Sequence, residues 1–311
     1  MLKSTETRTT MKSILIAGPT ASGKSGFALE LAKKINGIII NTDALQVYDQ
    51  WKILTARPDD QDMQGIPHAL YGHVKMDRAY SVGEWIKDVK QILQHTDLTP
   101  IFTGGTGLYF GALTNGLADI PAIPATIRIQ GNQIRSTQGK DGFAEILQKH
   151  DPETYLRIDQ NNPARLQRAW EVWQTTGKGL EYWKSTTPAP LIPLEDTRAM
   201  VLNWPVNLLN ERIDQRFDQM MDAGAIHEVE GVKTHYWHPA LPSSRALGAA
   251  EIIDAINSKI TMQDAVIKSK TLTRQFAKRQ RTWFRSKMSN WQQIDMCDHV
   301  LLQKIIENID T

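Results

Sequence analysis

Eight consecutive residues near the start of the chain match the pattern G-x-x-x-x-G-K-[ST], the P-loop of many nucleotide-binding (ATP-binding) proteins. They are Gly18, Pro19, Thr20, Ala21, Ser22, Gly23, Lys24 and Ser25. An apolar run at 14–17 precedes them and a helical pattern at 27–32 follows, so backbone N–H groups and a helix N-terminus should point at one anion. Lys24 would add a positive charge, and Ser25 would offer its hydroxyl to a Mg²⁺ ion shared with the phosphates. The stretch predicts a site for a diphosphate or a triphosphate.

Two further candidates follow later apolar strands. Asp43 comes after the run at 37–40 and is well placed to accept a proton from an incoming nucleophile; a helix cap or an indirect Mg²⁺ ligand is the alternative. A third strand, predicted at 100–103, leads into Gly-Gly-Thr-Gly at 104–107, whereas a P-loop NTPase usually has an aspartate there. This absence disfavours an ATPase. Thr106 would instead contact a second phosphate or a substrate chain, unless the glycines form a simple turn.

Arg212 and Arg216 lie four residues apart, so they share one face of a helix predicted from residue 207 to about 221. Two guanidinium groups aimed at the P-loop would neutralise a leaving diphosphate. The alternative is a solvent-exposed face on which they pair with Glu211, Asp214 or Asp218. Spacing alone leaves both readings open.

A strongly basic stretch lies at 268–287, where aromatic residues are interleaved with positive charges and no residue is acidic. Its cations are Lys268, Lys270, Arg274, Lys278, Arg279, Arg281, Arg285 and Lys287. A solvent-exposed helix normally carries both signs of charge, so this pattern favours binding to the phosphate backbone of a nucleic acid. Arg165 and Arg168 would add to such a surface.

The elements that would position these residues alternate between strand and helix over the first hundred residues. This order predicts an α/β fold: a P-loop core with a parallel sheet and helices on both faces, whose ligands sit beyond the carboxyl ends of the strands. The core would comprise 11–120 and 196–311, with basic C-terminal helices. Proline-rich boundaries enclose 121–195, which is predicted to be a mostly helical insertion. Residues 1–10 are polar and are expected to form a disordered extension.

Bulk composition describes an ordinary globular protein, with 41% hydrophobic residues, 23% charged residues and a net charge of +2. The single cysteine, Cys297, excludes an internal disulfide and a cysteine-based metal cluster. The eight histidines show no metal-binding spacing, and His68 and His73 are interpreted as structural or surface groups. No apolar run approaches the ~20 residues that span a bilayer. We therefore expect a cytoplasmic monomer.

Taken together and in this order, the motifs resemble those of the bacterial tRNA dimethylallyltransferases (tRNA isopentenyltransferases), from about Ile14 to Arg285. The matching stretches are the P-loop and residues 43–48, 55–58, 67–68, 79–82, 104–109, 151–152, 161–172, 245–248, 273–280 and 282–283. Four sites depart from the family pattern. Ala44 replaces a serine, Leu54 a glycine, Asn162 an aspartate, and Ala249-Ala250 a Tyr-Lys or Tyr-Arg pair.

The resemblance implies transfer of a dimethylallyl group from dimethylallyl diphosphate to N6 of the adenosine 3′ of the tRNA anticodon (position 37), with release of diphosphate. It implies Mg²⁺ as cofactor, tRNA as partner, Asp43 as base, and Lys24, Thr106 and Arg212 as catalytic groups. The insertion and the basic helix would hold the anticodon stem-loop. The implied tRNA contacts are Asp43, Ala44, Leu45, Gln46, Ala164, Arg165, Leu166, Gln167, Arg168, Arg245, Ala246, Leu247, Gly248, Lys278, Arg279, Gln280, Arg281, Thr282, Trp283, Phe284 and Arg285.

Two other functions share parts of this pattern. An enzyme that prenylates free adenine nucleotides would use the same core but would need no basic tRNA-binding surface. A P-loop kinase or a nucleotide-dependent RNA-binding module is disfavoured by the missing aspartate after the third strand.

Overall fold

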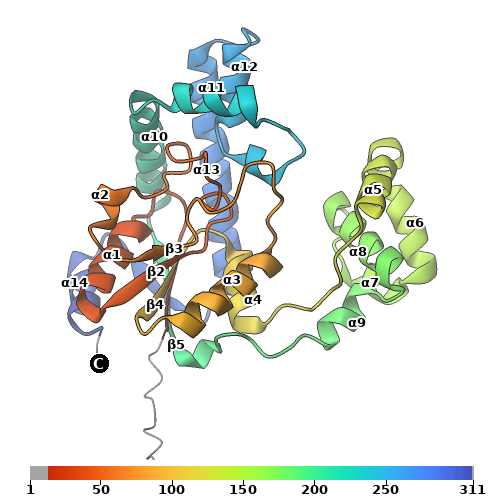
Figure 1. Ribbon diagram of the computed structural model, residues 1–311, viewed down its shortest axis with the longest axis horizontal. Coiled ribbons are helices and arrows are strands. Elements are labelled where there is room, and N and C mark those ends of the chain that lie inside the picture. The colour runs from red at the N-terminus through yellow and green to blue at the C-terminus, as the bar shows by residue number, and fades with distance from the viewer. Residues whose placement is uncertain (1–12, 310–311) are drawn as a thin grey trace, which may run out of the picture. The chain divides into compact units, whose positions relative to one another are not determined.

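The computed structural model describes residues 13–309, so the expected extension at 1–10 lies outside the described residues (Figure 1). Its central sheet contains six parallel strands in the order β3-β2-β4-β1-β5-β6. The strands are β1 (Ser13–Ala17), β2 (Gly37–Asn41), β3 (His68–Ala69), β4 (Thr99–Gly104), β5 (Thr197–Asn203) and β6 (Gln292–Asp295). The predicted parallel sheet is confirmed. The two edge strands were not predicted from the sequence. Strand β3 has only two residues, and β6 reads Gln-Gln-Ile-Asp, with one buried side chain, so neither is an apolar run.

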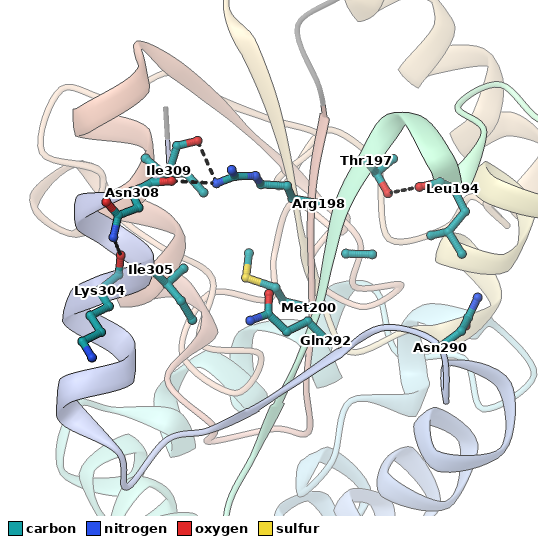
Figure 2. Close-up of a pocket in the computed structure, with 11 residues that line it drawn as sticks. Leu194, Thr197, Arg198, Met200, Asn290, Gln292, Lys304, Ile305, Asn308 and Ile309 are labelled. Atoms are coloured by element: carbon teal, nitrogen blue, oxygen red, sulfur yellow. Dashed lines mark hydrogen bonds between the residues drawn. The ribbon is translucent and has the colours of Figure 1, made fainter. Parts of the chain in front are cut away.

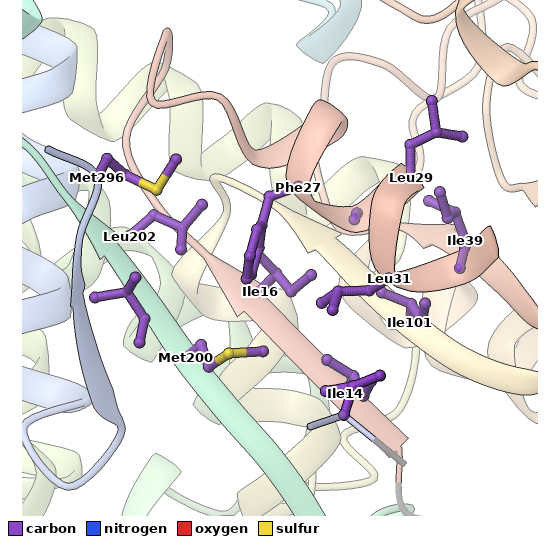
Figure 3. Packing of buried hydrophobic residues seen from close by; sticks show 14 residues of the cluster. Ile14, Ile16, Phe27, Leu29, Leu31, Ile39, Ile101, Met200, Leu202 and Met296 are labelled. Carbon is purple, nitrogen blue, oxygen red and sulfur yellow. The ribbon is translucent and has the colours of Figure 1, made fainter. Parts of the chain in front are cut away.

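Successive side chains along a strand point to opposite faces of the sheet, so alternate residues of each strand pack into two separate hydrophobic cores. Ile14 and Ile16 pack under α1 (Lys24–Ile35) and α14 (His299–Glu307), together with buried residues of the other strands (Figure 3). Leu15 and Ala17 face the opposite core, which contains residues of α3 (Val82–His95), α4 (Gly107–Asn115) and the last turns of α13 (Met262–Lys287). Both faces of the sheet are therefore covered by helices.

A further helical cluster packs around the loop that follows β2. It is built from α10 (Val206–Asp222), α11 (Ala225–His235), α12 (Ala249–Ile256) and α13, packed against the buried loop side chains Val47, Tyr48, Trp51 and Leu54. Helix α12 begins directly after Gly248. Gly248 before it has φ +90°, and a Cβ there would lie 2.9 Å from the Phe217 ring, so this position requires glycine. The short elements are α2 (Asp60–Met63), η1 (Leu194–Asp196) and η2 (Pro242–Arg245).

Residues 115–190 form a second compact unit. Its helices are α5 (Ala125–Gln138), α6 (Asp141–His150), α7 (Pro152–Arg157), α8 (Pro163–Thr176) and α9 (Leu180–Ser185). Helix α8 begins and ends at residues that favour helix termini: the Asn162 side chain accepts the Arg165 N–H, and Gly177, with φ +68°, ends the helix. A core of its own, which includes Phe143, Leu166 and Trp170, holds the unit together. No described helix of the chain is long and apolar enough to cross a membrane.

Candidate functional site

A cleft of about 720 Å³ lies beyond the carboxyl ends of β1, β2 and β4. Its lining brings together residues from the P-loop, the turn after β2, the end of β4, α10 and α13. They include Thr20–Ser25 of the P-loop, Asp43, Gln46, Thr103, Gly104, Arg212, Arg216, Leu247, Phe276 and Gln280. The P-loop and Asp43 thus meet at one end of the sheet as predicted, and of the two readings of Arg212 and Arg216 the structure supports the one in which they face the P-loop.

A second cavity, of about 530 Å³, lies at the opposite ends of the strands (Figure 2). It is lined by the first residues of β5 and by α14, and Arg198 there donates to the carbonyl oxygens of Asn308 and Ile309 at 3.0 and 2.9 Å. Thr197 pairs with Ser13 at the start of β1, whereas the P-loop follows the end of β1. The cavity is thus at the amino edge of the sheet, away from the predicted chemistry.

Two side chains bind carbonyl groups of the P-loop, Arg212 from α10 and Trp204 from the segment before it. The Arg212 Nε donates to the Ala21 carbonyl at 2.9 Å, and the Trp204 indole N–H donates to the Ser22 carbonyl at 2.9 Å. The guanidinium of Arg212 also stacks over the Trp204 ring, 4.5 Å from its centroid. Ala21 and Gly23 have φ of +62° and +87°, the left-handed turns that let this loop curl around an anion. Arg212 therefore shapes the cradle as well as lining it.

Three cations, Lys24, Arg212 and Arg216, line the cleft together with two carboxylates, Asp43 and Asp62. The pKa of Lys24 is lowered from 10.5 to about 7, mainly by desolvation and also by nearby Arg216, while Asp43 opposes the shift. Its ammonium donates to the Pro19 carbonyl at 2.8 Å. The pKa of Arg216 is lowered by desolvation, raised by Asp43 and lowered by Arg212. This surplus of positive charge, partly withdrawn from water, favours a ligand with several negative charges.

The turn that carries Asp43 is fixed by its own neighbours. The Asn41 side chain accepts the Asp43 N–H at 2.8 Å and donates to the carbonyls of Asp43 and Leu70. Asp43 Oδ1 accepts the Leu45 N–H at 2.9 Å. One carboxylate oxygen is thus engaged in the turn, which orients the group and leaves Oδ2 without a hydrogen-bond partner among residues 13–309.

Thr106 does not line the cleft. Its Oγ1 accepts the Ala44 N–H at 3.1 Å, and its own N–H donates to the Thr42 carbonyl at 3.1 Å, so it anchors the turn that carries Asp43. A Cβ on Gly104 would lie 2.4 Å from Thr42, so glycine is needed where β2 and β4 end side by side. The Thr106 hydroxyl accepts a hydrogen bond within the turn but does not donate one there. Its predicted contact with substrate would therefore have to be made by donating this hydroxyl proton.

Gln280 of α13, which was predicted to contact tRNA, lies inside the protein. It is buried, accepts the Thr20 N–H through Oε1 at 2.9 Å, and donates from Nε2 to the Gly105 carbonyl at 3.0 Å. A Cβ on Gly105 would lie 2.2 Å from this amide. Gln280 therefore joins the P-loop to the turn after β4, and the Thr20 N–H is not free for phosphate.

The cations of α13 divide into two groups. Those of its first half face acids of neighbouring helices: Lys268 with Glu251 at 3.5 Å, Lys270 with Asp218 at 2.6 Å, and Arg274 with Asp214 at 2.6 Å. Although residues 268–287 contain no acid, α10 and α12 supply carboxylates to these three cations. The second half has no ion pair with another described residue. Its cations are Lys278, Arg279, Arg281, Arg285 and Lys287.

Several other predicted tRNA contacts lie inside the protein. Phe284 packs in the core under the sheet, and Leu166, Gln167 and Ala246 are also buried, because each faces inward from its helix or turn. These four side chains cannot touch a partner in this conformation. Gly248 is likewise buried at its turn.

The remaining predicted contacts keep some exposure, and two of them carry weak ion pairs. Arg165 lies 3.9 Å from Asp159, and Arg168 lies 3.9 Å from Glu171. Leu45, Gln46 and Leu247 line the cleft, while Ala44 is half-buried in the core beside it. The exposed residues are Ala164, Arg245, Lys278, Arg279, Thr282, Trp283 and Arg285.

Sequence reasoning missed residues that act across long separations. Glu228 of α11 accepts three consecutive backbone N–H groups, from Lys52, Ile53 and Leu54, at 2.7, 2.7 and 2.9 Å. It fixes the loop that forms one wall of the cleft. His68 also lines the cleft, and its Nδ1 bonds to the Ile66 carbonyl at 2.8 Å. No local pattern marks Glu228, while His68 was interpreted from the sequence as a structural or surface group.

Comparison with known proteins assigns the chain to a family. The family model described as IPP transferase matches residues 46–287, and the model described as Isopentenyl transferase matches residues 11–73. The chain therefore belongs to the IPP transferase family.

Relatives with the same arrangement come from bacteria and eukaryotes. The chain is 49% identical to the tRNA dimethylallyltransferase of Cereibacter sphaeroides (strain ATCC 17025 / ATH 2.4.3), over 90% of this chain and 95% of that protein. It is also 49% identical to the tRNA dimethylallyltransferase of Roseobacter denitrificans, over 90% of this chain and 97% of that protein. Among solved structures, the tRNA isopentenylpyrophosphate transferase of Bacillus halodurans has a TM-score of 0.69 at 28% identity, covering 96% of both chains. A eukaryotic dimethylallyltransferase acting on tRNA has a TM-score of 0.79 at 27% identity, covering 92% of this chain and 74% of that one.

Proposed function

We propose that this protein transfers a dimethylallyl group from dimethylallyl diphosphate to N6 of the adenosine 3′ of a tRNA anticodon. The relatives' activity on tRNA supports the acceptor, and the cleft supports the donor chemistry. The observation that carries the proposal is the meeting of Asp43 with Lys24 and Arg216 beside the P-loop. A base and a polycationic cradle in one cleft are what a group transfer with a diphosphate leaving group needs.

The diphosphate of the donor would lie in the P-loop, against Lys24 and the two arginines of α10. As the bond between the allylic carbon and the diphosphate oxygen breaks, negative charge grows on the diphosphate, and these cations stabilise it. The new bond forms between that carbon and the exocyclic nitrogen of adenine. The proton released from this nitrogen passes to Asp43, whose orientation the Asn41 turn maintains.

A Mg²⁺ ion fits the donor atoms of this site. Mg²⁺ usually takes one or two protein ligands and completes its shell with phosphate oxygens and water. The Ser25 hydroxyl is exposed in the cleft, and the described residues contain no group of three or more His, Cys, Asp or Glu side chains that would make a protein-only cage. Ser25 would therefore hold the ion together with the diphosphate, and the bound ion would add charge neutralisation to that of Lys24.

The tRNA would be held by exposed cations and reached through base extrusion. The unpaired second half of α13 offers Lys278, Arg279 and Arg285 to phosphates, with Trp283 exposed among them. Arg165 and Arg168 of α8 would contribute from the helical unit. A base stacked in an anticodon loop must leave the stack to reach a cleft of this kind.

The test compares acceptors with radiolabelled dimethylallyl diphosphate as donor. Unmodified tRNA should become labelled, and AMP at equal concentration should not. The match of the isopentenyl transferase model to residues 11–73 favours the second candidate, a prenyltransferase for free adenine nucleotides. Labelling of AMP without labelling of tRNA would select that alternative.

A further inference from the structure

Tyr71 lines the same cleft as Asp43, and no step of the proposed reaction uses it. It lies two residues after β3 and is half-buried, packed against the hydrophobic cluster under α1. Its ring contacts the His68 ring, with centroids 5.6 Å apart, but its hydroxyl has no hydrogen-bond partner among residues 13–309. The hydroxyl of a tyrosine withdrawn from water usually has a partner, so this one is available to a ligand.

Backbone hydrogen bonds on both sides of Tyr71 hold it beside Asp43. The Asn41 amide donates to the Leu70 carbonyl at 2.9 Å, and the same amide donates to the Asp43 carbonyl at 3.0 Å. On the other side, the residue after Tyr71 donates its N–H to the Gln46 carbonyl at 2.9 Å. The turn that carries Tyr71 is therefore bonded to the chain two residues before Asp43 and three residues after it.

The backbone of this turn is itself unusual. Leu70 has φ +63° and Gly72 has φ +58°, so left-handed residues flank Tyr71 on both sides. Glycine adopts this conformation freely, whereas leucine does so at a cost that folded proteins accept mostly at functional sites. A Cβ on Gly72 would clash with the Arg57 guanidinium, so the turn has no room to shift.

The cleft at this point offers a hydrogen-bond donor next to an acceptor. Desolvation, and to a lesser extent the charge of Asp43, raise the pKa of Tyr71, so its hydroxyl remains a donor at neutral pH. Asp43 offers Oδ2 as the acceptor. Adenine is the complement of this pair, because its amino group donates and the ring nitrogens N1 and N7 flanking that group accept. Guanine has a carbonyl oxygen in place of the amino group, and this oxygen would face the carboxylate.

We infer that the Tyr71 hydroxyl donates a hydrogen bond to a ring nitrogen of the acceptor adenine while the N6 amino group of that base faces Asp43. The inference deepens the proposed function and rests on it, because it assigns recognition of the acceptor base at the same site. Tyr71 would orient N6 toward Asp43 and would contribute to the choice of adenine over guanine.

The test removes the hydroxyl from the protein and the ring nitrogen from the substrate, singly and together. For the wild type and Tyr71→Phe, kcat/KM is measured with dimethylallyl diphosphate and synthetic anticodon stem-loops whose target base is adenine, 1-deazaadenine or 7-deazaadenine. For one of the two analogues, the preference for adenine should be smaller in Tyr71→Phe than in the wild type by about tenfold, the loss expected when a buried donor has no partner. Any change in the intrinsic reactivity of an analogue acts on both proteins equally, so only a lost contact changes this ratio.

Tyr236→Phe is the matched control, since Tyr236 is exposed and does not line the cleft. Its preference for adenine over each analogue, and the inhibition of all three proteins by inorganic diphosphate, should equal those of the wild type. Weaker inhibition by diphosphate in Tyr71→Phe would place the hydroxyl on the leaving group and would overturn the inference.

Wild-type transfer combined with equal analogue ratios in the wild type and Tyr71→Phe would also overturn the inference, and would leave the proposed function standing. Absence of transfer to the adenine stem-loop by the wild type would instead refute the proposed function, and the inference with it.

Discussion

Lys24 is the residue whose charge state responds to the ligand. Without a donor, desolvation and Arg216 hold its pKa near 7, so its ammonium loses the proton as the pH rises above neutrality. A bound diphosphate favours the charged form and raises this pKa. Donor binding at pH 8 should therefore take up a proton, and affinity should fall by up to about tenfold per pH unit above 7.

Calorimetry of donor binding at pH 8 in two buffers of different ionisation enthalpy measures this uptake directly. The wild type should take up close to one proton per donor bound, because the ammonium must re-form. Lys24→Met should bind more weakly and take up none. Equal proton uptake in both proteins would place the titrating group elsewhere.

The site residues that could be predicted belong to short motifs, in which all the informative residues are close together in the sequence. The P-loop is contiguous, and Asp43 follows an apolar strand, so both positions in the cleft follow from the order of residues. Gln280 could not be placed from the sequence, because its contact with Thr20 spans 260 residues and depends on how α13 packs. The same holds for Glu228, which meets Lys52 across 176 residues.

At the scale of elements, the carboxylate of Glu228 in α11 fixes the loop that contains residues 52–54. Glu228→Ala leaves three backbone N–H groups without an acceptor and should destabilise the protein by about 2–4 kcal/mol, whereas Glu228→Gln keeps an acceptor oxygen and should cost about half as much. Because Leu54 and Thr55 of this loop line the cleft, donor KM should rise with the same ranking.

Thermal unfolding and donor KM would be measured in parallel, with Glu230→Ala as control. Glu230 is exposed on the same helix and lies 3.9 Å from His227, away from the loop. An unchanged donor KM in Glu228→Ala would show that the loop keeps its shape without this anchor.

Helix α13 allows a charge test within one element. Lys278 and Arg285 are exposed and have no ion pair among the described residues, whereas Lys268 and Lys270 already face Glu251 and Asp218. Replacing Lys278 and Arg285 by alanine should weaken tRNA binding and flatten its salt dependence by roughly one to two units, the size expected when two phosphate contacts no longer release counterions.

The matched control is the double variant Lys268→Ala and Lys270→Ala, which removes equal charge from the same helix. Its salt slope should stay near that of the wild type, since charges paired within the protein release few counterions. If the two double variants showed the same salt dependence of tRNA binding, the second half of α13 would have no special role in contacting phosphates.

At the scale of the whole molecule, the parallel α/β class was predictable because four strands are short apolar runs separated by helices. Helices α7, α8 and α13 were also predictable, since proline, asparagine and threonine at their starts are strong signals. Helices α2, α4, α5, α9, α11 and α14 were not predicted individually, and three of them show why. Helices α2, α9 and α11 carry weak signals. The first two are only four and six residues long, and α11 has weak amphipathic spacing and begins after a glycine without a side-chain cap.

The second compact unit, residues 115–190, is expected to contribute to tRNA binding but not to donor binding. The Ile192 N–H donates to the Leu113 carbonyl at 3.1 Å, so the core segments on either side of 115–190 are adjacent. A short Gly/Ser linker should therefore replace 115–190 without opening the sheet. The shortened protein should bind dimethylallyl diphosphate as the full chain does and lose most of its tRNA affinity. Full tRNA affinity would remove this unit from the proposed RNA-binding surface.

The most direct test of the account is the rate of label transfer from dimethylallyl diphosphate to unmodified tRNA by the wild type and by Asp43→Asn. The asparagine keeps the shape of the turn, including an oxygen for the Leu45 N–H, but cannot accept a proton at neutral pH. We expect wild-type transfer, and in the variant a rate lower by a factor on the order of 10² to 10⁴ with donor and tRNA affinities nearly unchanged. Near-wild-type transfer by Asp43→Asn would contradict the assignment of Asp43 as the base on which the mechanism depends.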